Sequence, residues 1–205
     1  MKNYVEITLL PNADIALYFL WQKVYQQIHI GFADIKREDD TIPIGVSFPG
    51  YDSENNLLGS KLRLFAENKE QLESLNVNKC LCRLLDYVHI SSIKEVPSNI
   101  GAFALFKRQQ VKSSISRLAR RKAKRHEIDF EAALASLNGF EEKHTKAPFV
   151  QMESLSTENG VKGDDGTGNG RHKFRLFIVK RLFDQPQKGT FNCYGLSQQA
   201  TVPWF

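Results

Sequence analysis

The residues best suited to do chemistry in this sequence are the cations of a basic stretch, residues 101–126. This stretch holds nine of the chain's 28 Lys and Arg residues and contains neither Asp nor Glu. The remainder of the chain has 19 basic and 23 acidic residues, a net charge of −4. Because like charges close together repel one another, this uneven distribution of charge indicates a polyanionic partner for the basic stretch. The nine cations are Lys107, Arg108, Lys112, Arg117, Arg120, Arg121, Lys122, Lys124 and Arg125.

Residues 113–126 are predicted to form a helix, with Ser113 or Ser114 available as the N-cap. At about 100° per residue, several of its cations share one side, backed by a thin apolar strip. Each aligned cation can displace a condensed counterion from a phosphate backbone. A single such helix fits the deep, phosphate-rich major groove of A-form RNA. We therefore predict nucleic-acid binding, with a structured RNA as the first choice. The aligned cations are Arg117, Arg120, Arg121, Lys124 and Arg125.

The basic helix has two other interpretations. A solvated surface helix is the first, but most such helices mix charge signs, and residues 101–126 contain no carboxylate side chain. A membrane surface is the second possible partner, but the apolar face is too small for stable insertion. Both therefore rank below nucleic acid.

Other motifs argue against a metal or nucleotide cofactor. Cys80, Cys82 and Cys193 match neither a disulfide framework nor a zinc-site spacing. The glycine-rich segment 158–171 is typical of a surface loop and lacks the Gly-Lys-Ser/Thr of a phosphate loop. No run approaches the ~18 apolar residues of a membrane helix, and residues 1–10 resemble a strand, not a signal peptide. We expect a cytoplasmic protein without a cofactor.

A scaffold must position these cations, and the order of predicted elements suggests one. Residues 1–98 are predicted as strand, helix, strand, strand, helix, strand, the ferredoxin-like (RRM-like) layout of many RNA-binding modules. This layout hosts many unrelated activities, so alone it is a weak guide to function. The strands are placed at 4–9, 44–48, 61–66 and 87–96, and the helices at 13–31, 68–75 and 79–86.

A domain boundary is expected at residues 97–99. The second domain, residues 99–205, is predicted to contain the basic helix, a short helix at 129–137, and strands at 103–111, 149–155 and 174–180. The predicted fold class is α+β: a ferredoxin-like domain over 1–98, then an RNA hairpin-binding domain with an arginine-rich helix and a small antiparallel sheet.

Several segments, taken in order, carry a resemblance that covers almost the whole chain. The most specific are Tyr-Gly-Leu-Ser at 194–197 and Pro-Trp-Phe at 203–205, and the others are 44–49, 107–113, 117–126, 154–157 and 174–178. Together they resemble the type I-F CRISPR repeat endoribonuclease, the subunit that processes crRNA for the type I-F interference complex. The resemblance implies a ferredoxin-like N-terminal domain and a C-terminal domain that grips a short RNA hairpin.

The resemblance also implies an activity. The family cuts precursor crRNA at the base of the repeat hairpin without metal, leaving a 2′,3′-cyclic phosphate and a 5′-hydroxyl. The enzyme then stays on its product as part of the interference complex, beside other protein subunits. An internal attack by the 2′-hydroxyl needs a base and an in-line geometry, and a neutral imidazole suits that base near neutral pH.

Catalytic roles are carried over by the same resemblance. The family's catalytic His corresponds to His29, its ribose-orienting serine to Ser154 with Ser156 in support, and its active-site tyrosine to Tyr194. An alignment shifted by four residues would instead place Tyr25 at the His position, one helical turn away on the same face. Residue chemistry alone does not single out His29 among the five histidines.

RNA-binding roles follow likewise. Arg108 and Gln110 correspond to two residues that read base edges at the bottom of the stem, where a guanidinium fork suits guanine and a carboxamide suits adenine. Phe174 corresponds to the aromatic that stacks on the terminal base pair. The remaining RNA-binding cations are Lys112, Arg117, Arg120, Arg121, Lys124 and Arg125.

Two rival functions remain open. The first is a subunit of the same complex that binds the hairpin without cutting it. The second, weaker rival is a protein that binds duplex DNA. Cleavage of repeat RNA and competition between hairpin RNA and duplex DNA at fixed salt separate these alternatives.

Overall fold

The computed structural model describes the whole chain except residues 112–114, 138–144 and 155–171, and it leaves the Arg117 side chain undescribed. The predicted loop at 158–171, together with Lys112 and Ser156, therefore lies outside the described residues. The fold is mixed α+β, with antiparallel strand pairs and few helices. The chain forms two compact units, Met1–Arg108 with Ala147–Phe205, and Gln109–Lys146.

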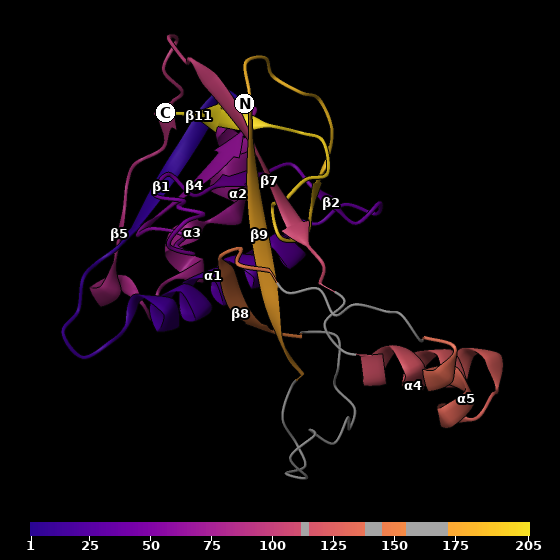
Figure 1. Cartoon of the computed structure of the whole chain (residues 1–205). Helices are drawn as coiled ribbons and strands as arrows, with labels where there is room; N and C mark the ends of the chain where they lie inside the picture. The colour runs from indigo at the N-terminus through magenta and orange to yellow at the C-terminus, as the bar shows by residue number, and fades with distance from the viewer. Residues whose placement is uncertain (112–114, 138–144, 155–171) are drawn as a thin grey trace. The chain divides into compact units, whose positions relative to one another are not determined.

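The first sheet of the larger unit is built around β1 (Asn3–Leu9) and β4 (Lys61–Ala66). Its strand order is β3-β4-β1-β5, with β6 also paired to β1. Figure 1 labels β4, β1 and β5 of this sheet. All these pairs are antiparallel. Alternate residues of β1 are buried, as expected for a strand with one face on a core. The strands predicted at 4–9 and 61–66 are confirmed. The shorter strands are β3 (Gly45–Ser47), β5 (Val88–Ile90) and β6 (Lys94–Glu95).

The strand predicted at 87–96 is interrupted between β5 and β6. Ser91 explains the interruption, because its hydroxyl accepts a 2.9 Å hydrogen bond from the Glu6 main-chain N–H. The side chain thus takes the place of a main-chain carbonyl in the ladder. The Ser91 N–H still donates to the Glu6 main-chain oxygen at 2.9 Å, so the segment stays beside β1.

The long helix α1 (Leu17–Asp34) supplies much of the core. Its buried residues recur every three or four positions, which is the stripe of an amphipathic helix. It begins later than the predicted residue 13, because the Asn12 side chain accepts hydrogen bonds from the N–H groups of Asp14 and Ile15 and holds a turn there. The buried residues of the stripe are Leu20, Trp21, Val24, Tyr25, Ile28, His29 and Phe32.

The second predicted helical region is shorter than expected. Helix α2 (Lys69–Leu75) begins with a capping box between Asn68 and Gln71. It ends at Asn76, whose φ of 47° is left-handed and stops the helix. The predicted helix at 79–86 is instead α3 (Val77–Cys80), a turn, and the short 3-10 helix η1 (Leu85–Tyr87).

A second sheet completes the larger unit. Its order is β11-β7-β9-β8, formed by β7 (Ala102–Gln109), β8 (Phe149–Glu153), β9 (Lys173–Phe183) and β11 (Val202–Trp204). A separate pair joins β2 (Thr41–Ile42) to β10 (Phe191–Asn192). One continuous hydrophobic core contains residues of both sheets and of α1. The N-terminal and C-terminal parts of the chain therefore fold on a shared core.

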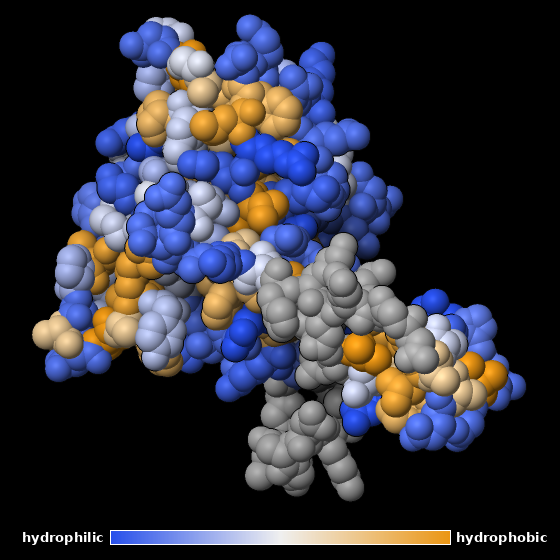
Figure 2. Space-filling model, in the orientation of Figure 1, coloured by the Kyte–Doolittle hydropathy of each residue, from blue (hydrophilic) through white to orange (hydrophobic). Residues whose placement is uncertain are grey.

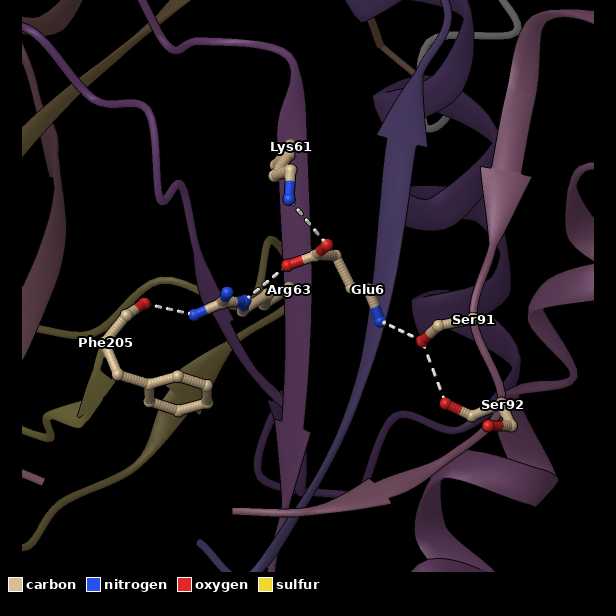
Figure 3. A network of polar contacts seen from close by, with 6 residues as sticks. All are labelled: Glu6, Lys61, Arg63, Ser91, Ser92 and Phe205. Atoms are coloured by element: carbon tan, nitrogen blue, oxygen red, sulfur yellow. Dashed lines mark hydrogen bonds and ion pairs between the residues drawn. The ribbon is translucent and has the colours of Figure 1, made fainter. Parts of the chain in front are cut away.

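A polar network joins the last residues of the chain to the first sheet (Figure 3). The Glu6 carboxylate accepts hydrogen bonds from Lys61 Nζ at 3.0 Å and Arg63 Nε at 2.7 Å. The Arg63 guanidinium also donates to the main-chain oxygen of Phe205 and lies 4.3 Å from the centre of its ring. Burial raises the pKa of Glu6, but the two cations outweigh it and hold that pKa below its ordinary value.

The smaller unit consists of α4 (Ile115–His126) and α5 (Phe130–Ala135), which pack against each other. Ala119 on α4 and Ala133 on α5 are both fully buried. The Asp129 side chain caps α5 by accepting a hydrogen bond from the Glu131 N–H at 2.9 Å. Thr145 Oγ1 donates to Gln109 Oε1 at 2.9 Å, so the two ends of this unit are adjacent.

The face of the larger unit seen in Figure 2 is mostly hydrophilic, with apolar side chains gathered in its upper part and near the start of α1. Leu17, Tyr18 and Phe19 are exposed in the first turn of that helix. Lys23 lies on the next turn and places its ammonium nitrogen 5.2 Å from the centre of the Phe19 ring. Among the described helices, none has the length and apolar character needed to span a membrane.

Candidate active site

His29 is held in one orientation on the buried side of α1. Its side chain is 8% exposed, and Nδ1 lies 2.8 Å from the main-chain oxygen of Cys193. A carbonyl oxygen can only accept a hydrogen bond, so Nδ1 carries the proton. In the neutral ring, Nε2 then has a free lone pair. The arrangement thus fixes the tautomer in which Nε2 can act as a base.

The surroundings keep this imidazole neutral and reachable. Burial lowers the pKa of His29 below its ordinary value, and the hydrogen bond to Cys193 offsets only part of that effect. In the described part of the chain, no buried side-chain nitrogen or oxygen lacks a partner. Nε2 has no partner there, so it must keep contact with solvent. A substrate hydroxyl can therefore approach it.

Tyr194 forms one wall of the His29 site. The two rings stack with centroids 4.4 Å apart and an interplanar angle of 15°. The main-chain oxygen of Tyr194 accepts a 2.8 Å hydrogen bond from the Tyr25 hydroxyl, one turn before His29 on α1. Tyr25 is fully buried, and burial raises the pKa of its hydroxyl. Tyr25 therefore stays protonated and donates a structural hydrogen bond.

The turn that presents Tyr194 is rigidly defined. The Asn192 carboxamide oxygen accepts hydrogen bonds from the main-chain N–H groups of Tyr194 at 2.9 Å and Leu196 at 3.3 Å. Gly195 has a φ of 71°, and a Cβ there would lie 2.4 Å from Val46 Cγ1. The tight turn thus requires glycine both for its backbone angle and for the space available.

Arg108, at the end of β7, joins this aromatic wall. Its guanidinium carbon lies 5.5 Å from the ring centres of both Phe174 and Tyr194. The Phe174 ring meets Tyr194 edge-on at 6.4 Å and stacks with His172 at 6.5 Å. Burial raises the pKa of Tyr194, and the Arg108 cation lowers it in part. A cation and half-buried aromatic rings beside His29 form a surface suited to stacking on a base.

Ser154 directly follows β8, the strand that packs against α1. It is half-buried, and its main-chain N–H donates to the His172 oxygen at 2.9 Å. The preceding residue, Glu153, is bonded to the Gln26 side chain of α1. The strand end that carries Ser154 is therefore tied to the same helix as His29.

The predicted site residues fall into three groups. The structure brings His29, Tyr194, Arg108 and Phe174 together in the larger unit, with Ser154 directly after β8, the strand that packs against α1. Ser156 and Lys112 lie outside the described residues, as does the Arg117 side chain. Gln110 and the other predicted RNA-binding cations belong to the smaller unit.

The smaller unit presents cations on one side of α4. Arg120, Arg121, Lys124 and Arg125 are all exposed, and the described residues offer none of them an ion pair. Lys122 lies on the side of α5 instead, where Nζ donates to Ser136 Oγ at 2.6 Å. Gln110 is also exposed.

The structural roles of two site residues were not predicted from the sequence, where Tyr25 was considered only as the alternative to His29 under a shifted alignment. Tyr25 and Gln26 are ordinary helix residues until the fold brings the Tyr194 and Glu153 main chains within hydrogen-bond reach. The described residues contain no group of three or more His, Cys, Asp or Glu side chains that could hold a metal ion.

Comparisons with known proteins match one family over almost the whole chain. Residues 4–205 match the sequence model of a family described as "CRISPR-associated protein (Cas_Csy4)". A protein of Escherichia coli (strain UTI89 / UPEC), named "CRISPR-associated endonuclease Cas6/Csy4", is 33% identical over 206 residues, covering 100% of both chains. A protein of the same name from Pseudomonas aeruginosa (strain UCBPP-PA14) is 31% identical, again covering 100% of both chains. The chain therefore belongs to the Csy4 family of CRISPR-associated proteins.

Proposed function

We propose that this chain is a metal-independent endoribonuclease that binds the CRISPR repeat hairpin and cuts precursor crRNA at the base of the stem. Family membership supports nuclease activity, because the curated relatives are named CRISPR-associated endonucleases. The observation that carries the proposal is the orientation of His29. Its Nδ1 is held by the Cys193 carbonyl, so Nε2 is left free in a neutral ring.

The reaction is an internal transesterification. Nε2 of His29 takes the proton of a ribose 2′-hydroxyl, and the 2′-oxygen attacks the adjacent phosphorus. The bond from phosphorus to the 5′-oxygen then breaks, and that oxygen gains a proton. The products are a 2′,3′-cyclic phosphate and a 5′-hydroxyl. The Ser154 hydroxyl holds the ribose in line for attack, with Ser156 as a supporting hydroxyl.

Two surfaces bind the hairpin, one on α4 and one at the base of the stem. The α4 cations Arg120, Arg121, Lys124 and Arg125, together with Arg117 and Lys112, bind phosphates along the major groove. Arg120, Arg121, Lys124 and Arg125 are exposed and have no acidic partner among the described residues, which supports this role. At the base of the stem, Phe174 stacks on the terminal base pair, while Arg108 and Gln110 read base edges.

The scaffold in this proposal is a ferredoxin-like domain followed by a hairpin-binding domain, divided at residues 98 and 99. The strand order β3-β4-β1-β5 supports the first part. Numbered along the chain as strands one to four, this order becomes two, three, one, four, in which the strands that precede the two helices, β1 and β4, lie side by side. After cutting, the protein stays on its product as part of an interference complex with other subunits.

A second candidate is a hairpin-binding subunit that does not cut. The α4 cations and His29 belong to different compact units, so this candidate keeps the hairpin binding of α4 and lacks only the chemistry of His29. The two candidates share the RNA and differ only in chemistry.

One experiment distinguishes them. Repeat hairpin RNA is incubated with the parent protein and with Ser154→Ala in EDTA, and the ends of the products are analysed. We expect the parent to cut once and leave a 2′,3′-cyclic phosphate, and Ser154→Ala to cut slowly while binding with nearly unchanged Kd. Bound but uncut RNA would support the binding subunit. Cleavage that is lost in EDTA and restored by Mg²⁺ would contradict metal independence.

A further inference from the structure

The Gln26 side chain makes a two-point contact with the backbone of β8. Its Oε1 accepts a hydrogen bond from the Glu153 main-chain N–H at 2.9 Å, and its Nε2 donates to the Glu153 oxygen at 3.3 Å. The carboxamide thus pairs with a strand residue as another strand's peptide group would.

The location of this contact on β8 explains why a side chain is needed. β8 is an edge strand, with β9 on one side only. The Ser154 N–H donates to the His172 oxygen on the β9 side. Because successive residues of an antiparallel strand point their main-chain groups to opposite sides, those of Glu153 point away from β9. They would be unpaired in the sheet, and Gln26 satisfies both.

The contact also joins the two parts of the candidate active site. Gln26 lies three residues before His29 on α1, and Glu153 lies directly before Ser154. Ser154 is therefore fixed on one side by β9 and, through its neighbour, by the helix that carries His29. The two tethers leave the main chain at Ser154 little freedom relative to α1.

We propose that Gln26 is a positioning residue that sets the place of the Ser154 hydroxyl relative to the His29 imidazole. This inference rests on the proposed function, in which His29 takes the 2′-hydroxyl proton and Ser154 aligns the ribose. In this role Gln26 acts through the Glu153 main chain and not on the RNA or the reacting atoms. Its effect belongs to the rate of the chemical step, not to hairpin affinity, because its two hydrogen bonds are to Glu153 and not to any residue assigned to hairpin binding.

The test uses the full chain with Gln26→Met, which keeps the side-chain length and removes both hydrogen bonds. We expect the single-turnover cleavage rate at saturating protein to fall about 10- to 100-fold, since a small displacement of an aligned group has effects of this size. The hairpin Kd should not change. Gln27→Met is the matched control, because Gln27 is exposed and its side chain makes no hydrogen bond with the described residues. It should cut at the parent rate.

A double-mutant cycle with Ser154→Ala tests whether Gln26 acts through Ser154. We expect Gln26→Met to have little further effect in the Ser154→Ala background, because coupled residues are not additive. Amide hydrogen exchange at Glu153 provides a readout independent of activity, and it should accelerate in Gln26→Met. If Gln26→Met does not fold, Gln26→Glu retains the acceptor for the Glu153 N–H, and its rate should lie below that of the parent.

The outcomes separate the two proposals. A parent that cuts, with a Gln26→Met protein that cuts equally fast, overturns the role of Gln26 alone. Full additivity of Gln26→Met and Ser154→Ala overturns it as well. A parent that does not cut, or a Ser154→Ala protein that cuts at the parent rate, overturns the proposed chemistry and this inference together.

Discussion

The Tyr25 hydroxyl donates a 2.8 Å hydrogen bond to the main-chain oxygen of Tyr194, a residue 169 positions later in the chain. One helical turn on, His29 bonds the oxygen of Cys193, so α1 holds two consecutive carbonyls of the same turn. This pairing keeps the Tyr194 ring stacked on His29 and fixes the tautomer of the imidazole. It also gives Tyr25 a structural role beside the proposed base.

Replacing Tyr25 with Phe tests that structural role. The Tyr194 carbonyl loses its partner in a buried setting, so the free energy of unfolding should fall by about 1–3 kcal/mol. Urea denaturation of the two proteins measures the difference. Hairpin cleavage should persist below the melting temperature. A folded Tyr25→Phe protein without activity would instead point to Tyr25 as a member of the chemistry.

Replacing His29 with Ala removes the proposed base. The single-turnover cleavage rate should drop about 10²- to 10⁴-fold, the range expected for loss of general base catalysis, while the hairpin Kd stays nearly constant. His89→Ala is a suitable control, because His89 is exposed on β5. Equal cleavage by His29→Ala and the parent would refute the assignment.

The pH dependence of cleavage should report the environment of His29. The ring acts as a base only when it is neutral, so the rate falls as pH drops through its pKa. Burial lowers the pKa of His29 from its ordinary 6.5, so the midpoint of the acid limb should lie below 6.5. Single-turnover rates across pH 4–8 measure this limb. A midpoint above 6.5 would contradict a lowered pKa for the reacting imidazole.

Single replacements on α4 should weaken binding, because each removes a cation that neutralises a phosphate. For Arg120→Ala and Arg121→Ala, we expect the slope of log Kd against log salt to decrease by roughly one for each phosphate that is no longer neutralised. Fluorescence anisotropy with hairpin RNA at several salt concentrations measures these slopes. Lys69→Ala is the control, since Lys69 on α2 is already paired with Glu73 at 3.3 Å. Unchanged slopes for both arginine variants would argue against groove binding.

Patterns local in sequence predicted the main elements of this fold. Alternation of apolar residues located β1 and β4, and apolar residues spaced three to four positions apart located α1. An element that buries one face has apolar residues at its own structural period, so the sequence alone shows it. The charge pattern likewise identified the cations of α4 without any structure. The resemblance to a known family supplied His29, which residue chemistry alone could not choose among five histidines.

Contacts between distant segments could not be predicted in this way. The strands β2 and β10 are two residues long, too short for a period, and exist because they pair with each other. Gln26 looks like any polar residue on a helix until the edge of β8 reaches it. Arg108 beside Phe174 depends equally on the alignment of β7 with β9. The positions of site residues thus came from tertiary packing, which a single sequence does not display.

The bond between His29 and Cys193 also sets the order in which the candidate site is assembled during synthesis. The two residues are 164 positions apart. At the usual speed of translation, the Cys193 carbonyl is made roughly 10–30 s after the imidazole it orients. Over that interval the histidine has no fixed tautomer and no stacking partner at Tyr194. A ribosome-bound chain interrupted before this turn would carry its basic helix without an aligned imidazole, so the proposed hairpin-binding surface would form before the proposed base is in place.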